Sequence, residues 1–338
     1  MKNILYIGNK LNTAKANVSA IQTLGILLES EGYHLRYASS YNNKILRFID
    51  MIWSCIKYSK WADAVLIDTY STQNFYFALA CSQICRLFKV PYIPILHGGN
   101  LPKRLLSHPK LCNSLFKHSH YNVSPSRYLL EKFDEMGYVN TMHIPNSIHI
   151  DDYNIQNKTF ENIRLLWVRA FSEIYNPELA VSIVHKLKML GYEAELCMVG
   201  PDADGSLEGV KSKALALSVS VTFTGKLTKT EWIALSKNYN IFINTTNFDN
   251  MPVSVLEAMA LGFPVVSTNV GGLPFLIDDK TNGLLVTPNE VEGFVEAIVT
   301  IYQNEDLRHK LSQNARIKAE NFDWLSIKSQ WNSILSTK

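Results

Sequence analysis

The sequence lacks several features that would assign it to a special class of protein. None of its 338 residues falls in a low-complexity tract, and no apolar run reaches the roughly 18 residues that a membrane-spanning helix needs. The first ten residues change from a strand pattern to a loop too early for a secretory signal peptide. We therefore expect an unexported, cytoplasmic protein, with peripheral attachment to the inner face of a membrane as an open alternative.

Cysteine is scarce, and its spacing does not match the common zinc and redox sites. Cys81 and Cys85 are four residues apart, which suits one face of a helix. All five cysteines have apolar surroundings, and no two of them show the CxxC spacing: Cys55, Cys81, Cys85, Cys112 and Cys197. We expect plain core thiols in a reducing compartment, where disulfides are rare.

Charge is distributed unevenly, although the net charge of the chain is only +3. Residues 1–150 hold 16 Lys and Arg against 8 Asp and Glu, whereas residues 151–338 hold 17 against 22. Seven of the nine histidines also lie in the first half. A basic half suggests contact with something anionic, such as a membrane surface or a phosphate-bearing acceptor, although an ordinary soluble surface explains the same numbers.

Short aliphatic runs alternate with longer amphipathic stretches, a pattern typical of βαβ units and parallel sheets. In the first half we expect strands at Asn3–Ile7, His34–Ala38, Ala64–Ile67, Tyr92–Leu96, Tyr121–Val123 and Thr141–Ile144. In the second half we expect strands at Arg164–Val168, Glu193–Val199, Val219–Phe223, Ile241–Asn244, Pro264–Ser267 and Leu284–Val286. Polar, irregular residues at 145–162 separate the two series. We therefore predict the α/β class, with two doubly wound parallel-sheet domains.

Two helices expected in the first half have distinct signatures. The segment Ala14–Glu31 is followed by Gly32, as a helix closed by glycine should be. The segment Lys44–Lys60 places four isoleucines on one face, with basic residues elsewhere: Ile45, Ile49, Ile52 and Ile56. A helix that packs on its own sheet and a basic helix that lies on a membrane share this pattern, and we favour the packed interpretation.

The most informative segment is 248–268, which predicts the end of a strand, a helix and the next strand. Asn250 or Asp249 can cap the helix, and Pro252 suits the first helical position because an N–H there would have no helical acceptor. A Gly-x-Pro sequence starting at Gly262 then ends the helix. A helix that begins after the carboxyl end of a parallel strand presents free N–H groups and a positive dipole end, which bind phosphate.

A diphosphate bound at this helix would need further partners. The helix dipole contributes only about 0.3–1 kcal/mol per charge, so we expect a cationic side chain as well, and Arg169 is our candidate. Glu257 lies too far along the helix to meet phosphate, but its carboxylate can accept hydrogen bonds from a diol such as a ribose. Asp249 can do the same for sugar hydroxyls. Either acid alone could be a cap or a solvated residue, but their spacing around the helix start favours binding.

This segment resembles the family 4 retaining glycosyltransferases, in which an acid is followed by seven residues and then by a Glu in a helix reading EAMA-x-G-x-P-V-V. The similarity continues at 144–148, 199–201, 223–225, 268–274 and 282–286. The resemblance implies a GT-B fold, in which two Rossmann-like domains face an interdomain cleft. It implies an acceptor-binding domain at 1–152, a nucleotide-sugar-binding domain at 153–318, and a terminal helix at 319–338 that crosses back to the first domain.

The resemblance also implies a reaction and a set of site residues. A sugar would pass from a nucleotide-diphosphate donor, such as a UDP- or GDP-sugar, to an acceptor with retention of anomeric configuration and without a metal. Glu257 would bind the ribose, and amides near Val253 and Ser254 would bind the diphosphate, which would itself help to deprotonate the acceptor. The expected donor-binding residues are Gly200, Lys226, Asp249, Asn250, Met251, Val253, Ser254 and Glu257. The expected catalytic residues are His97, Arg169 and Asp249.

The chain departs from the family pattern at three places. Asp249 stands where Glu is commoner, and Asn250 replaces the usual Gly. Ile174 occupies the place of a family lysine, so diphosphate neutralisation relies on fewer charges, and Lys226 is a candidate substitute. The glycine-rich loop expected after the first strand is reduced to residues 8–10.

His97 follows an expected strand and precedes two glycines, where a sugar hydroxyl or its proton could be met. A hydrogen-bonded structural histidine is the alternative. Asn9, Gly98 and Gly99 are the candidate acceptor-binding residues. The acceptors that are common in this family, together with the basic first half, favour a glycan or lipid-linked acceptor. The protein would then act in the assembly of cell-surface polysaccharide or lipid-linked oligosaccharide.

Other functions remain open at this point. A sugar-nucleotide epimerase or a phosphorylase can share the same architecture, and so can a catalytically idle sugar-binding or scaffold subunit. A nicotinamide dehydrogenase is rejected, because residues 8–11 do not form G-x-G-x-x-G. Nucleic-acid binding is disfavoured, because the basic residues are dispersed and lack an interleaved aromatic platform.

Overall fold

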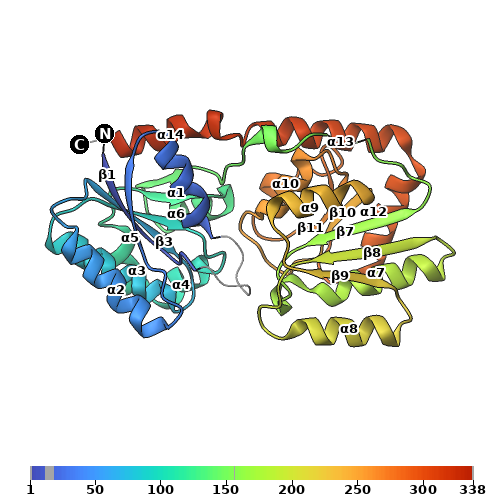
Figure 1. The fold of residues 1–338 in the computed structure, drawn as a ribbon, viewed down its shortest axis with the longest axis horizontal. Coiled ribbons are helices and arrows are strands. Elements are labelled where there is room, and N and C mark those ends of the chain that lie inside the picture. Colours follow the sequence, from blue (N-terminus) through green and yellow to red (C-terminus); the bar gives the residue numbers. More distant parts are fainter. Residues whose placement is uncertain (1, 12–18, 156, 337–338) are drawn as a thin grey trace. The chain divides into compact units, whose positions relative to one another are not determined.

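The chain forms two compact units, each built on its own parallel sheet. The computed structural model describes residues 2–11, 19–155 and 157–336. Unit 1 comprises residues 1–147 and 324–338, and unit 2 comprises residues 148–323. Each unit contains a six-stranded sheet in which every adjacent pair of strands is parallel (Figure 1). The predicted α/β class with two parallel sheets is confirmed.

The sheet of unit 1 has the strand order β2-β1-β3-β4-β5-β6. Its strands are β1 (Asn3–Ile7), β2 (His34–Ala38), β3 (Ala64–Thr69), β4 (Tyr92–Leu96), β5 (Asn122–Ser124) and β6 (Thr141–His143). Each begins and ends within two residues of its expected position. The central strands β1 and β4 are almost fully buried and form nearly continuous apolar runs, which are recognised easily from sequence, whereas the edge strand β2 alternates exposed and partly buried residues.

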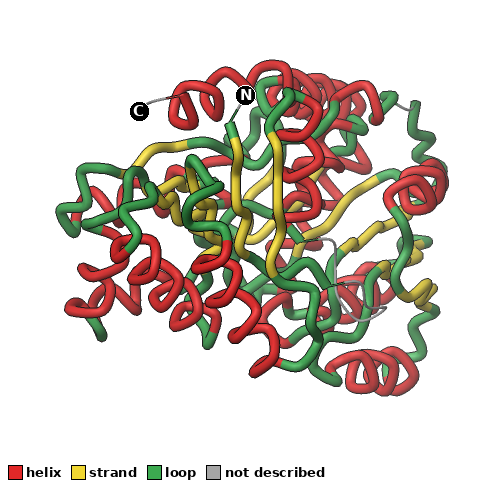
Figure 2. The backbone as a smooth tube through the Cα atoms, turned by 60° about the vertical axis from the view of Figure 1, so that its left-hand side comes forward, coloured by secondary structure: helices red, strands yellow, loops and turns green. Residues whose placement is uncertain are grey.

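Helices cover both faces of this sheet (Figure 2). They are α1 (Ala20–Ser30), α2 (Lys44–Lys57), α3 (Asn74–Leu87), α4 (Leu101–Ser107), α5 (Pro109–Phe116), α6 (Arg127–Glu135) and α14 (Trp324–Ser336). The helices α1 and α14 share one buried cluster with the sheet, and α2 to α6 share another. Gly32 closes α1 at a φ of +89°, as predicted, whereas the expected residues 14–18 of that helix lie outside the described residues.

The helix α2 lies where the sequence predicts it, but its apolar face is turned the other way. Ile45 is 70% exposed and Ile49 is 57% exposed. The residues of α2 that are buried against the unit are Arg47, Met51, Ser54 and Cys55. The packed interpretation is therefore wrong for Ile45, Ile49 and Ile56, which are exposed, whereas Ile52 packs against the core. The hydrophobic period shows that one face is apolar but not where that face points.

The sheet of unit 2 has the strand order β12-β11-β10-β7-β8-β9. Its strands are β7 (Ile163–Val168), β8 (Ala194–Val199), β9 (Val221–Gly225), β10 (Ile241–Asn244), β11 (Val265–Thr268) and β12 (Leu284–Val286). The α-helices are α7 (Pro177–Met189), α8 (Ser206–Ala216), α9 (Lys229–Leu235), α10 (Val253–Ala260), α11 (Leu273–Leu276), α12 (Val291–Gln303) and α13 (Glu305–Glu320). Short 3-10 turns are η1 (Ile150–Asp152), η2 (Glu173–Tyr175) and η3 (Ser236–Asn238).

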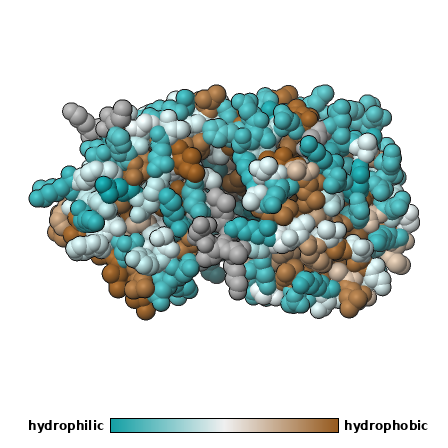
Figure 3. Space-filling view, in the orientation of Figure 1, coloured by the Kyte–Doolittle hydropathy of each residue, from teal (hydrophilic) through white to brown (hydrophobic). Residues whose placement is uncertain are grey.

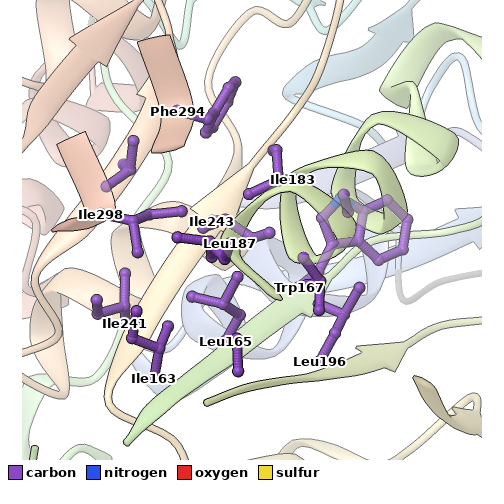
Figure 4. Close-up of a cluster of buried hydrophobic side chains, with 14 of the residues drawn as sticks. Ile163, Leu165, Trp167, Ile183, Leu187, Leu196, Ile241, Ile243, Phe294 and Ile298 are labelled. Carbon is purple, nitrogen blue, oxygen red and sulfur yellow. The ribbon is translucent and has the colours of Figure 1, made fainter. Parts of the chain in front are cut away.

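One apolar core of unit 2 lies between the sheet and the helices α7, α8 and α12. Figure 4 shows side chains from β7, β8 and β10 meeting those of α7 and α12, among them Ile163, Leu165, Trp167, Ile183, Leu187, Leu196, Ile241, Ile243, Phe294 and Ile298. A second core on the opposite face holds the buried side of α10. The sheet is therefore anchored on both faces, and its carboxyl edge is left to the connecting loops.

Two further expectations concern thiols and membrane spans. All five cysteines are free and buried, which confirms that they are core thiols. Among the described residues, no helix combines the length and the hydropathy needed to cross a bilayer.

The C-terminal helix α14 tests how much unit 1 depends on a distant part of the chain. Trp331 is 3% exposed and packs in the cluster shared with β1 and α1. We predict that Trp331→Ala lowers the free energy of unfolding by about 3–5 kcal/mol, because it leaves a large cavity. Leu325→Ala, on the exposed side of the same helix, is the control and should change it by less than about 0.5 kcal/mol. Urea denaturation followed by circular dichroism measures both, and equal effects would contradict this packing.

Candidate functional site

The unit 2 residues singled out from the sequence follow neighbouring strands. Arg169 follows β7, Gly200 follows β8, and Lys226 follows β9 as an exposed side chain. Residues 245–252 connect β10 to α10. Because the carboxyl ends of parallel strands meet at one edge of a sheet, these residues share that edge, where open α/β sheets bind their ligands.

Arg169 and Asp249 form an ion pair through Nη2 and Oδ2. Their side chains are only 13% and 14% exposed. The guanidinium of Arg169 also stacks on Tyr175, with the guanidinium carbon 4.1 Å from the ring centroid. The other carboxylate oxygen of Asp249 accepts a hydrogen bond of 2.7 Å from the backbone N–H of Asn250. The structure therefore brings two of the predicted catalytic residues into direct contact.

The start of α10 differs slightly from its sequence prediction. Pro252 is the N-cap residue and not the first helical residue, and its φ of −71° and ψ of 113° are extended. Because Pro252 itself holds the capping position, the predicted cap by Asn250 or Asp249 is wrong.

The backbone N–H groups of Val253 and Ser254, the first of the helix, have no helical acceptor. The Ser254 hydroxyl is buried and has no hydrogen-bond partner among the described residues. A hydroxyl without a partner therefore lies beside amides without helical acceptors, at the positive end of a helix.

Two glycines hold the loops of this edge close together. Gly200 has a φ of +151°, and a side chain there would collide with the backbone carbonyl of Arg169. Gly271 has a φ of +55°, and a side chain there would collide with the carbonyl of Asp249. That carbonyl also accepts a 3.0 Å hydrogen bond from Gly272. Gly200, expected to bind a ligand, thus has a clear packing role at the site.

Glu257 lies on the next turn of α10 and has a partner that the sequence did not reveal. The Tyr153 hydroxyl donates a 2.6 Å hydrogen bond to Glu257 Oε1. Lys229 Nζ lies 4.6 Å from the centroid of the Tyr153 ring and 2.9 Å from Asp152 Oδ2. Burial raises the pKa of Glu257, and the Tyr153 hydrogen bond and the charge of Lys229 only partly oppose this. Tyr153 belongs to the irregular segment 145–162, where no pattern in the sequence points to it.

In unit 1, His97 is held by a carboxylate that the sequence also did not reveal. His97 Nε2 lies 2.9 Å from Asp68 Oδ1, and the buried Tyr6 hydroxyl donates a 3.0 Å hydrogen bond to the same oxygen. The Tyr70 ring lies 5.4 Å from the His97 ring, centroid to centroid. A carboxylate accepts hydrogen bonds, so Nε2 carries the proton and Nδ1 is left as the acceptor of a neutral His97.

The remaining predicted residues of unit 1 surround Asp68. Asn9 follows β1, the neighbour of β3, and both Asn9 and Asp68 line a small pocket with Gly8, Tyr70 and Asn74. Gly98 packs against the backbone at Tyr70, where a side chain would collide, and Gly99 is half-buried. The structure thus gathers Asn9, His97 and Gly98 around the ends of three adjacent strands. No group of three or more metal-binding side chains occurs among the residues that the structure describes.

The partly buried carboxylate of Glu257 predicts a pH dependence of stability. Because its pKa is raised in the folded protein, folding favours the protonated form. The free energy of unfolding therefore falls as the pH rises from the ordinary glutamate value of about 4.3 to the higher folded value, and then levels off.

We predict that Glu257→Gln, which cannot ionise, loses this decrease and gains stability relative to the native chain as the pH rises. Thermal unfolding between about pH 5 and pH 8 measures it. Glu296→Gln, at an exposed position on α12, controls for the loss of one negative charge. Parallel pH profiles for all three proteins would contradict the burial of Glu257.

Sequence comparisons identify the second part of the chain. Residues 151–318 match the profile of the family "Glycosyl transferases group 1". A D-inositol 3-phosphate glycosyltransferase of Saccharomonospora viridis is 42% identical over 69 residues, which make up 20% of this chain and 16% of that protein. Matches to two other curated glycosyltransferases cover 28% and 35% of those proteins, so these three relatives are matched over a minor part of their length.

Solved structures match the fold of nearly the whole chain. Sucrose-phosphate synthase from Thermosynechococcus elongatus has a TM-score of 0.82 at 15% identity, covering 99% of this chain and 98% of that one. Anabaena HepE, solved in complex with UDP-glucose, has a TM-score of 0.80 at 16% identity, covering 99% and 100%. The fold is GT-B, with two Rossmann-like parallel sheets, as the sequence predicts. Residues 151–318 form a domain of the group 1 glycosyltransferase family.

Proposed function

We propose that this protein is a retaining glycosyltransferase of family 4 that moves a sugar from a nucleotide-diphosphate donor to a glycan or lipid-linked acceptor. The start of α10 is the observation that carries the proposal. There, free N–H groups, the unpartnered Ser254 hydroxyl and the Arg169–Asp249 pair occur within one family-matched domain. HepE, which shares the fold, binds UDP-glucose, and this supports a nucleotide sugar as the donor.

The geometry of α10 suggests how such a donor would lie. The diphosphate would accept hydrogen bonds from the amides of Val253 and Ser254 and from the Ser254 hydroxyl. The ribose diol would donate to Glu257, whose Oε1 already accepts from Tyr153 and thereby has a fixed position. Asp249, with Asn250 and Met251 beside it, would receive the hydroxyls of the transferred sugar.

The leaving diphosphate must be stabilised by few charges. Arg169 forms an ion pair with Asp249 in the loop before α10, and Ile174 replaces the lysine that the family usually has. A helix start contributes about 0.3–1 kcal/mol per charge, which is small beside the several kcal/mol that a transition state requires. We therefore assign most of this stabilisation to Arg169, with Lys226 as a supplementary cation. Asp249 would share the guanidinium with the diphosphate when the donor is bound.

The residues around Asp68 are our proposed acceptor site. His97, whose Nε2 is held by Asp68, would present Nδ1 to a sugar hydroxyl, and Asn9, Gly98 and Gly99 would line the approach. In a retaining transfer the donor's own diphosphate would take the acceptor proton on the same face. His97 would then orient the acceptor and not act as an obligatory base. The basic character of residues 1–150 favours a cytoplasmic role in cell-surface polysaccharide synthesis, with an anionic acceptor or a membrane nearby.

A catalytically idle sugar-binding subunit is the second candidate. Two observations favour it: Ile174 in place of a lysine, and a guanidinium already paired with Asp249. A subunit of this kind would bind the nucleotide sugar but leave it intact with every acceptor. A sugar-nucleotide epimerase would instead convert the donor alone into a different sugar nucleotide.

We predict that a nucleoside diphosphate stabilises the chain against thermal unfolding. A ligand at about 100 times its dissociation constant adds roughly 2.7 kcal/mol, which is several degrees in a domain of this size. Differential scanning fluorimetry with UDP, GDP, ADP and the matching monophosphates would identify the base. Inorganic phosphate at the same concentration is the control. No shift with any diphosphate would contradict a donor site at α10.

We predict that Arg169→Ala lowers turnover about 100-fold or more while changing the donor KM much less. The physical reason is that the leaving diphosphate gains charge in the transition state, so Arg169 stabilises this state more than the bound donor. Release of the nucleoside diphosphate from the donor, with and without acceptor, measures the effect. Because Arg169→Ala leaves Asp249 unpaired, and Asp249 is itself a proposed sugar ligand, Arg169→Lys is the control: it keeps a cation beside Asp249 and should retain more turnover than Arg169→Ala. Unchanged turnover in Arg169→Ala would refute the assignment.

A further inference from the structure

The helix α2 presents an apolar surface to solvent, which we call the α2 stripe. The stripe consists of Ile45, Leu46, Ile49, Trp53 and Ile56, with exposed fractions of 70, 51, 57, 60 and 38%. Figure 3 shows hydrophobic side chains gathered at the lower left, where Figure 1 places α2. Single exposed apolar residues are ordinary, but a contiguous apolar helix face marks an interaction site.

The orientation of α2 is fixed by its opposite face. Met51 and Cys55 are buried in the core shared with α3, and the ring of Phe48 lies 4.9 Å from that of Phe77 on α3, centroid to centroid. Arg47 is also buried on this side, and its Nη1 donates a 3.3 Å hydrogen bond to the carbonyl of Tyr41. A surface helix normally buries its apolar face and exposes its charges. Here an arginine lies inside and three of the four isoleucines lie outside, so internal packing does not explain the pattern.

The charges around the stripe are almost all positive. In residues 43–60 and 73–90, which contain α2 and the adjacent helix α3, Asp50 is the only acidic residue. The exposed cations of these segments are Lys44, Lys57, Lys60, Arg86 and Lys89. Leu87 and Phe88, at the end of α3, are 73% and 43% exposed beside two of these cations. An apolar stripe with a cationic border is complementary to an anionic bilayer, which offers acyl chains beneath negatively charged headgroups.

We propose that α2 is an interfacial helix that attaches this unit to an anionic membrane surface. The stripe would lie at the boundary between headgroups and acyl chains, and Trp53 would occupy the interfacial level that tryptophan prefers. Lys57 and Lys60 would meet lipid phosphates. A second copy of the chain fits less well, because a two-fold pairing through α2 would bring each cationic border against itself. This inference goes beyond the proposed transfer reaction and does not depend on it.

Vesicle co-sedimentation of the 338-residue chain tests the proposal. We expect binding to phosphatidylcholine vesicles containing about 30% phosphatidylglycerol, and at least tenfold weaker binding to pure phosphatidylcholine. The variant Ile45→Ser/Ile49→Ser/Trp53→Ser should lose at least tenfold in binding, because it removes most of the stripe. The control Ile26→Ser/Val139→Ser/Leu215→Ser changes three other exposed apolar residues and should bind like the native chain.

A second arm tests the charges and the depth of insertion. Lys57→Glu/Lys60→Glu should weaken binding to the anionic vesicles at least tenfold. Vesicles with brominated acyl chains should quench Trp53, which is 60% exposed, and Trp53→Phe should remove this quenching while vesicle binding persists. The nucleotide-induced thermal shift, which reports on unit 2, should be the same in all variants, so that failure of the donor site is distinguished from failure of this proposal.

Three results would overturn the proposal. One is equal vesicle binding by the native chain and the stripe variant. Another is binding of the native chain that is indifferent to phosphatidylglycerol. The third is no vesicle binding together with a concentration-dependent dimer in sedimentation velocity that the stripe variant abolishes, which would assign the stripe to a second copy of the chain.

Discussion

The ion pair between Arg169 and Asp249 is the interaction on which the proposed donor site of unit 2 depends. Arg169 follows β7 and Asp249 follows β10, and these strands are neighbours in the sheet. The pair therefore joins the loop after β7 to the loop that leads into α10. Gly200 lets its backbone approach that of Arg169 closely, and Gly271 does the same at Asp249. Both charges are mostly withdrawn from water, so either one alone would be left uncompensated. The pair thereby ties down Asp249, which lies four residues before Val253, the first residue of α10.

The ion pair is connected to the hydrophobic core through a short series of contacts. The buried Trp167, at the end of β7, donates a 3.0 Å hydrogen bond from Nε1 to Thr245 Oγ1, at the end of β10. The Thr245 hydroxyl in turn lies 2.9 Å from the carbonyl of Tyr175, whose ring stacks under Arg169. Trp167 thus positions Thr245, Thr245 positions Tyr175, and Tyr175 supports Arg169. Supporting contacts of this kind preorganise a binding group.

Much of the fold was predictable because its signals are local. Each strand is a short apolar run, and the spacing of Asp249 and Glu257 identified the entrance of α10 from one segment. Tyr153 and Asp68 were missed because their roles arise from contacts across 104 and 29 residues of sequence, which no local pattern records. The amphipathic helix α2 was predicted correctly, but the prediction of its buried face was wrong, because periodicity does not say which side of a helix meets the sheet.

Two features of the chain oppose folding, and neither has an explanation in packing. Glu257 is a carboxylate whose burial raises its pKa, and the α2 stripe leaves five large apolar side chains in water. A glutamine in place of Glu257 and polar residues in place of the stripe would avoid both costs. Local violations of otherwise consistent rules are expected where a ligand completes the structure. A diol that donates to Glu257 and a bilayer that covers the stripe would each satisfy what the isolated chain leaves unsatisfied, which is why each of the two proposed sites coincides with a local violation of the folding rules.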